Sequence, residues 1–161
     1  MPRPPVDAPS DNLAPIADAP AFSLPIRVYW EDTDAGGVVY HASYLRFMER
    51  ARTEGLRTLG LSQQVLQEQA DRVFVVRDMQ IDFRAPARLD DLLEVRSSLL
   101  RPGRASLVFA QEIVRPGDGR VLVQARVRVA CLVASSFRPC ALPALVRERI
   151  QESLHLFAHG N

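Results

Sequence analysis

The chain has 161 residues, 47% of them hydrophobic, and its 20 basic and 19 acidic residues give a formal net charge of +1. A chain of this length forms one domain with a sizeable core. Its balanced charge provides no broad positive field, which argues against nucleic acid or an anionic membrane as a partner. Cys131 and Cys140 show no metal or redox spacing, so we expect two reduced thiols.

The N-terminal region has an unusual composition. Residues 1–23 contain six of the twelve prolines and follow neither a helical nor a strand period, which predicts a disordered tail. No apolar run reaches the roughly eighteen residues of a membrane helix, and the basic and apolar blocks of a signal peptide are missing. We therefore expect a cytoplasmic protein without a transmembrane segment, folded over residues 24–161.

The folded region opens with a strand and a long helix. Ile26, Val28 and Trp30 alternate with more polar neighbours, which predicts a first strand over residues 25–31. Apolar residues then recur at spacings of three and four, at Tyr44, Met48, Ala51, Gly55 and Leu59. This pattern predicts a helix over 41–59, roughly 28 Å long at 1.5 Å per residue, that ends at Gly60. Ser62 is expected to cap a shorter helix through about Asp71.

Four further segments have the alternation typical of strands. They are residues 73–84, 91–100, 105–115 and 120–133, followed by a possible short helix over 144–150. Proline and glycine at 101–104 and 116–119 predict turns, so the neighbouring strands are expected to pair as antiparallel hairpins. The order of one strand, one long helix and four strands indicates the α+β class, with the helix packed on one face of an antiparallel sheet.

An acid-rich turn directly precedes the long helix and is the main candidate for chemistry. Gly36 and Gly37 permit a tight reversal that brings Asp34 toward the first turn of the helix. The backbone N–H groups of that first turn lack intrahelical partners and lie at the positive end of the helix dipole. A carboxylate beside free donors suits attack on a polar carbonyl group.

The same stretch resembles a known family. The sequence RVYWEDTDAGGVVYHASYL at 27–45, ERARTE at 49–54, APARLDD at 85–91, SLVF at 106–109 and RPCALP at 138–143 is similar to that of the Tol-Pal-associated (YbgC-like) acyl-CoA thioesterases. These enzymes belong to the 4-hydroxybenzoyl-CoA thioesterase group of hot-dog proteins. The resemblance covers about residues 25–150, and Trp30 departs from the tyrosine that relatives often have there.

The resemblance implies a fold and an assembly. It implies a hot-dog fold, in which a five-stranded antiparallel sheet wraps around one long helix. It further implies homodimers or homotetramers with active sites at the dimer interface, acyl-CoA as substrate, neither metal nor redox cofactor, and possible Tol-Pal or lipid-metabolism partners. Independently, the exposed edge and outer face of a single sheet favour pairing of protomers.

The resemblance also assigns the site. Asp34, ionised at neutral pH as an ordinary aspartate is, would be the nucleophile or the general base. The backbone N–H of His41 would be the oxyanion donor, its imidazole would lie in the site, and Tyr40 would bind substrate. The alternative for Asp34 is a purely structural role in shaping the turn or capping the helix. Asp32 is expected to orient the turn rather than to share a proton with Asp34.

Other polar residues are weaker candidates. Arg101 and Arg104 flank a turn and are candidates for binding the phosphates of coenzyme A, as are Arg84 and Arg88, because guanidinium groups bind phosphate well. Glu54 is expected to pair with Arg50 on the helix surface. His155 and His159 have a spacing that suits a metal, but no third ligand is evident, so we interpret them as surface residues.

The sequence therefore predicts an acyl-CoA thioesterase that produces a free acid and coenzyme A. A Gly-x-Ser-x-Gly motif is missing, which excludes a thioesterase of the α/β-hydrolase type. Two other hypotheses remain: a non-catalytic acyl- or protein-binding module linked to the Tol-Pal envelope system, and a hot-dog dehydratase acting on a carrier-bound hydroxyacyl group.

Overall fold

The computed structural model describes Leu13, residues 21–100 and residues 102–158. Its sheet is antiparallel with strand order β1-β3-β4-β5-β2, and consists of β1 (Ala21–Arg27), β2 (Arg72–Phe83), β3 (Leu92–Leu99), β4 (Ser106–Arg115) and β5 (Arg120–Val133). The described helices are η1 (Trp30–Asp32, a 3-10 turn), α1 (His41–Thr58), α2 (Gln63–Ala70) and α3 (Ala144–Ala158). None of these helices has both the length and the apolar character needed to cross a membrane.

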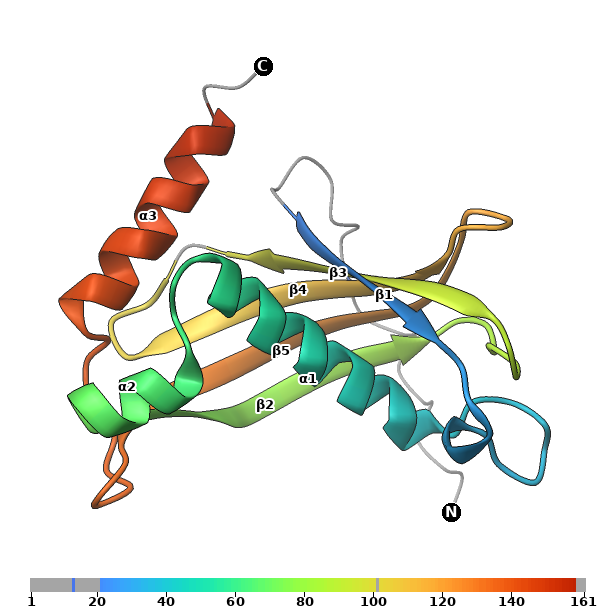
Figure 1. Cartoon of the computed structure of the whole chain (residues 1–161), viewed down its shortest axis with the longest axis horizontal. Coiled ribbons are helices and arrows are strands. Elements are labelled where there is room, and N and C mark those ends of the chain that lie inside the picture. Colours follow the sequence, from blue (N-terminus) through green and yellow to red (C-terminus); the bar gives the residue numbers. More distant parts are fainter. Residues whose placement is uncertain (1–12, 14–20, 101, 159–161) are drawn as a thin grey trace, which may run out of the picture.

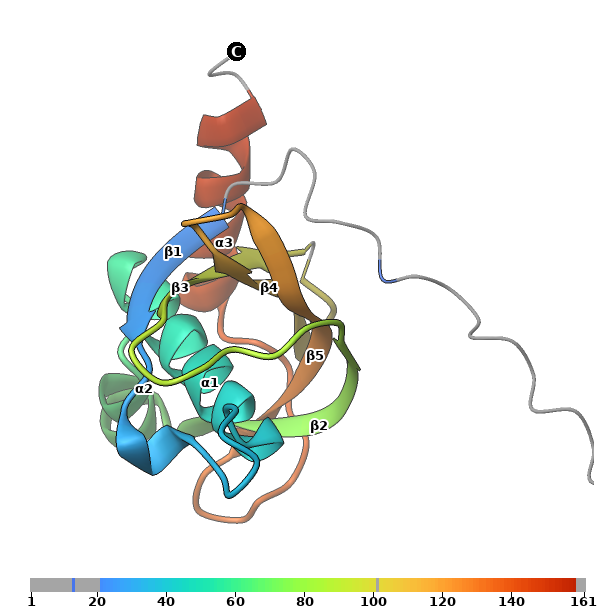
Figure 2. The same cartoon turned by 90° about the vertical axis from the view of Figure 1, so that its right-hand side faces the viewer.

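The sheet curves around α1 (Figures 1 and 2). The predicted α+β class and the order of one strand, one long helix and four strands are confirmed, as are the β3–β4 and β4–β5 hairpins. The concave face of the sheet meets α1, and most of the core lies between them. The helix contributes the buried apolar side chains Tyr44, Phe47, Met48, Ala51 and Leu56. Val95, Ile113 and Val123 lie in register on neighbouring strands and are fully buried.

A buried arginine crosses the contact between α1 and β4, and sequence analysis did not predict it. The guanidinium of Arg52 donates a hydrogen bond to Gln111 Oε1 at 2.9 Å, and Gln111 Nε2 donates to the Met48 carbonyl at 3.0 Å. Burial lowers the pKa of Arg52, and the nearby charge of Glu49 partly opposes this shift. The pair satisfies polar groups that would be costly to bury alone.

The predicted first strand is displaced toward the N-terminus. β1 begins at Ala21, inside the segment predicted as a tail, because residues 21–23 pair with β3. It ends at Arg27 rather than at residue 31. The carboxylate of Asp32 accepts a hydrogen bond from the Tyr29 N–H at 2.9 Å and closes the 3-10 turn, so Trp30 is 79% exposed instead of inward-facing. The predicted tail before residue 21, Leu13 apart, lies outside the described residues.

Several helix details also differ from the sequence-based expectations. Ser62 occupies the N-cap position of α2, but its side chain makes no capping hydrogen bond. Glu54 forms an ion pair with Arg57 rather than with Arg50. The C-terminal helix α3 continues to Ala158, well beyond the predicted residue 150. α1 ends at Thr58, one residue before the predicted end, and Gly60 follows the C-cap Leu59 with a positive φ of 75°, as expected of a helix-ending glycine.

Both cysteines are free thiols, as expected. Cys131 lies on β5 and is fully buried, whereas Cys140 is half-buried, and their Sγ atoms lie 3.6 Å apart. Burial raises the pKa of Cys131 to about 12, with a further contribution from the contact with Cys140. Cys131 is therefore protonated at pH 8 and has little of the reactive thiolate form.

We expect alkylation to separate the two thiols. Iodoacetamide at pH 8 should modify Cys140 well before Cys131 in the native protein, because only Cys140 is partly accessible. In guanidinium chloride both should react at similar rates, since unfolding restores an ordinary thiol pKa. Peptide mass spectrometry over a time course would measure the two rates, and equal rates in the native protein would contradict the prediction.

Candidate active site

The acidic turn before α1 is closed by its own hydrogen bonds. The Asp34 N–H donates to the Val38 carbonyl and the Gly37 N–H to the Asp34 carbonyl, both at 3.0 Å. Asp34 Oδ1 accepts from the Gly36 N–H at 2.8 Å. Gly37 has a φ of 75°, and a Cβ added at Gly36 would lie 3.0 Å from Asp34 Oδ1. The tight reversal predicted from the two glycines is therefore confirmed.

Asp34 itself is exposed in the single chain. Its carboxylate helps to hold the turn, as the structural alternative proposed. No hydrogen bond or ion pair joins it to His41 among the residues that the structure describes. The exposed oxygens remain accessible to a substrate or to a second copy of the chain. Asp34 therefore has a structural role in the turn, and its exposed carboxylate is also accessible for a chemical role.

Asp32 anchors the turn to the helix start. It is 6% exposed, its carboxylate accepts from Tyr29, and its carbonyl accepts from the Tyr40 N–H at 2.8 Å. A bridge between Thr33 and Val39 closes the loop. Because Asp32 is buried and Asp34 is exposed, Asp32 orients the turn as expected.

α1 begins at His41, and backbone N–H groups of its first turn are potential hydrogen-bond donors for a ligand. Tyr40 is the N-cap in extended conformation, and its carbonyl accepts from the Ser43 N–H at 2.8 Å. Within the described ranges no acceptor is found for the His41 N–H. The first turn of the helix contains no acidic residue, so no side chain there offsets the partial positive charge of the helix end. This end can bind a developing negative charge.

A cavity of about 270 Å³ opens beside this helix start. Its walls come from three places that are distant in sequence: the turn before α1, the first helical turn, and the end of β2 with the loop that follows. The lining residues are Val39, His41, Tyr44, Phe83, Arg84, Ala85 and Pro86. Most of this lining is apolar, as is usual for small-molecule sites.

Aromatic contacts arrange the mouth of the cavity. The rings of Tyr40 and His41 lie 4.4 Å apart, and the ring of His41 meets Phe83 edge-on at 6.4 Å. Tyr44 contacts Phe83 at 5.9 Å. His41 therefore lines this cavity, whereas Tyr40, directly before it in the chain, is 44% exposed.

The candidate arginines are spread over the molecule. Arg104 lies just before β4, which is roughly 30 Å long and ends at Arg115. Arg115 forms an ion pair with Asp91, at the end of the segment whose first residues line the cavity. Arg104 is thus remote from His41 within one chain. Arg101 lies outside the described residues. Of the three candidate arginines that the structure describes, Arg84 alone lines the cavity, and it pairs with exposed Asp82 at 3.0 Å.

The remaining cavity residues gave little sequence signal. Phe83, Ala85 and Pro86 stand at the end of a strand with no motif of their own apart from the family stretch at 85–91. His155 lies in α3 and His159 outside the described residues. In the part of the chain that the structure describes, no group of three or more side chains is placed to hold a metal ion.

The fold is that of a hot-dog protein. Its candidate site combines a backbone N–H donor at the start of α1 with a mostly apolar cavity. The chain belongs to the thioesterase superfamily, whose sequence model matches residues 36–122. It is 53% identical over 123 residues to the acyl-CoA thioester hydrolase YbgC of Escherichia coli O6:H1, covering 76% of this chain and 90% of that protein. The acyl-CoA thioesterase YbgC of Haemophilus influenzae is 48% identical over 126 residues, covering 78% and 91%.

Solved structures agree with this assignment. A probable thioesterase from Bartonella henselae is 37% identical with a TM-score of 0.72, covering 77% of this chain and 100% of that chain. A 1,4-dihydroxy-2-naphthoyl-CoA thioesterase from Synechocystis is 26% identical with a TM-score of 0.76, covering 83% and 97%. The predicted hot-dog fold is confirmed.

Proposed function

We propose that this protein hydrolyses acyl-CoA thioesters to a free acid and coenzyme A. The observation that carries the proposal is the start of α1: the His41 N–H has no acceptor among the residues that the structure describes, and His41 lines a mostly apolar cavity that begins at the turn before the helix. The likeness to YbgC enzymes over most of the chain supports acyl-CoA as the substrate class.

In the proposed reaction the thioester carbonyl oxygen accepts a hydrogen bond from the His41 N–H. The partial charge of the helix start then stabilises the oxyanion that forms when the carbonyl carbon is attacked. Asp34 supplies either the attacking carboxylate or the base. In the first route the carboxylate forms a mixed anhydride and expels the thiolate of coenzyme A, and water then cleaves the anhydride. In the second route Asp34 takes a proton from a water as its oxygen attacks the carbonyl carbon, the C–S bond breaks to release the thiolate of coenzyme A, and the proton on Asp34 passes to that thiolate.

We further propose that a second copy of the chain completes the site. β2 is an edge strand of the sheet, and its last residue, Phe83, lines the cavity and is 46% exposed. Trp30, Tyr40 and Val76 are other exposed large side chains. Pairing of protomers would cover the edge strand and bring a further wall to the exposed Asp34 carboxylate. A role for Arg104 in binding coenzyme A would require this second chain.

The test is steady-state hydrolysis of a panel of acyl-CoA esters, from acetyl to palmitoyl and benzoyl, with release of free thiol as the readout. We expect turnover of at least one ester well above its spontaneous hydrolysis. A failure of the wild-type protein to hydrolyse any ester would overturn the proposal. Formation of an enoyl product from a hydroxyacyl thioester would instead favour a dehydratase.

A further inference from the structure

We infer that Tyr44 is a positioning residue, whose hydroxyl holds the 85–91 segment against the start of α1 and so sets the width of the cavity at His41. The inference rests on the proposed function and deepens it. It adds to the site a residue inside the helix that does no chemistry itself.

The side chain of Tyr44 links the cavity to the core. Its ring lines the cavity, the residue is only 4% exposed, and its hydroxyl oxygen accepts a hydrogen bond from the Ala87 N–H at 3.0 Å. Burial raises the pKa of Tyr44 above its ordinary value, while the Ala87 N–H partly opposes the shift. The phenol therefore stays neutral at physiological pH and serves as the acceptor for a buried amide.

Ala87 joins the segment to the acidic turn as well. Its carbonyl accepts from the Val39 N–H at 2.9 Å, two residues before His41. Val38, next to Val39, accepts from the Asp34 N–H. One fully buried residue thus connects the helix interior, the chain leading into the helix start and the Asp34 turn.

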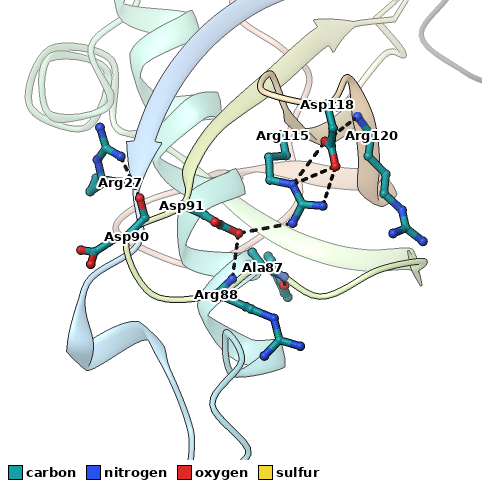
Figure 3. A network of polar contacts seen from close by, with 9 residues as sticks. Arg27, Ala87, Arg88, Asp90, Asp91, Arg115, Asp118 and Arg120 are labelled. Atoms are coloured by element: carbon teal, nitrogen blue, oxygen red, sulfur yellow. Dashed lines mark hydrogen bonds and ion pairs between the residues drawn. The ribbon is translucent and has the colours of Figure 1, made fainter.

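The C-terminal end of the 85–91 segment is held by contacts that do not involve Tyr44. Figure 3 shows the Asp91 carboxylate accepting hydrogen bonds from the Arg88 N–H at 2.9 Å and from the Arg115 guanidinium at 3.4 Å. Arg115 is itself held by Asp118 at the β4–β5 turn. The start of the segment is held as well, because the Ala85 N–H donates to the Leu122 carbonyl at 3.1 Å. Loss of the Tyr44 hydroxyl would therefore release the segment locally at Ala87, directly after Pro86, which lines the cavity.

The two roles of Tyr44 can be separated by mutation, because its ring packs in the core and its hydroxyl holds the 85–91 segment. Tyr44→Phe keeps the ring that packs on Phe47 and Phe83 but leaves the Ala87 N–H buried without its acceptor. The segment should then shift to find another acceptor, which moves the cavity wall relative to the His41 amide. Small misplacements of this kind slow a reaction more than they weaken binding of the remote parts of a substrate.

The test compares Tyr44→Phe with Gln111→Met, which removes two buried hydrogen bonds between α1 and the sheet, one from Arg52 and one to the Met48 carbonyl, outside the cavity lining. For the best ester of the panel we expect Tyr44→Phe to lower kcat about ten- to a hundredfold with KM changed less than about threefold. Gln111→Met should lower the melting temperature yet keep the wild-type kcat. A wild-type kcat in Tyr44→Phe, or an equal loss of kcat in Gln111→Met, would overturn the inference.

Amide hydrogen exchange gives a readout that does not depend on turnover. In Tyr44→Phe the amides of Ala87 and Val39 should exchange faster relative to the core amides of β4 and β5 than they do in the wild type. Gln111→Met lowers the global stability, so it should leave this ratio unchanged. If the wild-type protein hydrolyses no ester, the proposed function fails, but exchange still decides the positional claim. Unchanged exchange at Ala87 relative to these core amides in Tyr44→Phe would refute that claim even in an active enzyme.

Discussion

Replacing Asp34 by asparagine should lower kcat on the order of a hundred- to ten-thousandfold, the usual effect of losing a carboxylate that acts as base or nucleophile. Asparagine keeps a side-chain oxygen that can accept from the Gly36 N–H, so the turn that Asp34 closes in the wild type is preserved. The variant thus removes the negative charge and leaves the local geometry in place. Thiol release under saturating acyl-CoA would measure the effect.

Two companion variants make this result specific. Glu31→Gln removes another exposed acid three residues away and should keep the wild-type kcat. Asp34→Ala removes both the charge and the turn hydrogen bond, so its additional loss of melting temperature relative to Asp34→Asn reports the structural role. An Asp34→Asn enzyme with wild-type kcat would show that Asp34 only shapes the turn.

Replacing His41 by proline should lower kcat on the order of a hundred- to a thousandfold, because it deletes the backbone donor proposed to bind the oxyanion. The substitution suits the fold. Proline is favoured at the first position of a helix, where its missing N–H breaks no intrahelical bond. The preceding residue, Tyr40, is already extended at φ −62° and ψ 133°, as a residue before proline prefers.

His41→Ala is the matched control, since it removes the imidazole and keeps the amide. We expect its kcat to fall much less than that of His41→Pro, while circular dichroism and melting temperature show both variants folded. Equal losses in the two variants would assign the effect to the imidazole instead of the backbone. A fully active His41→Pro enzyme would rule out this amide as the oxyanion donor.

The fold was predictable because most of its signals are local. The period of 3.6 in residues 41–59, the alternation in the four later strands and the turn residues between them each reflect contacts close in sequence. The first strand was misplaced because a single side chain, Asp32, captured the Tyr29 N–H and ended the alternation. A pattern of alternating hydrophobicity cannot indicate that a side chain will form a hydrogen bond with a nearby backbone N–H and end the strand.

The candidate site was predictable only in part, for a similar reason. The Asp34 turn and the helix start at His41 lie within one motif, and their geometry follows from two glycines and a helix boundary. The hydrogen bond that ties the 85–91 segment, and with it the cavity-lining Ala85 and Pro86, to Tyr44 joins residues 43 positions apart. The Arg52–Gln111 pair spans 59 positions. Such long-range hydrogen bonds leave no periodic pattern in a single sequence.

The His41 amide, for which the described part of the chain offers no acceptor, affects how the protein tolerates mutation. Nineteen of the twenty coded amino acids carry a backbone N–H, so nearly any codon change at position 41 keeps this donor. Only proline deletes it. On the proposed mechanism, evolution could alter the side chain that faces the substrate, and with it the choice of acyl group, without dismantling the reaction.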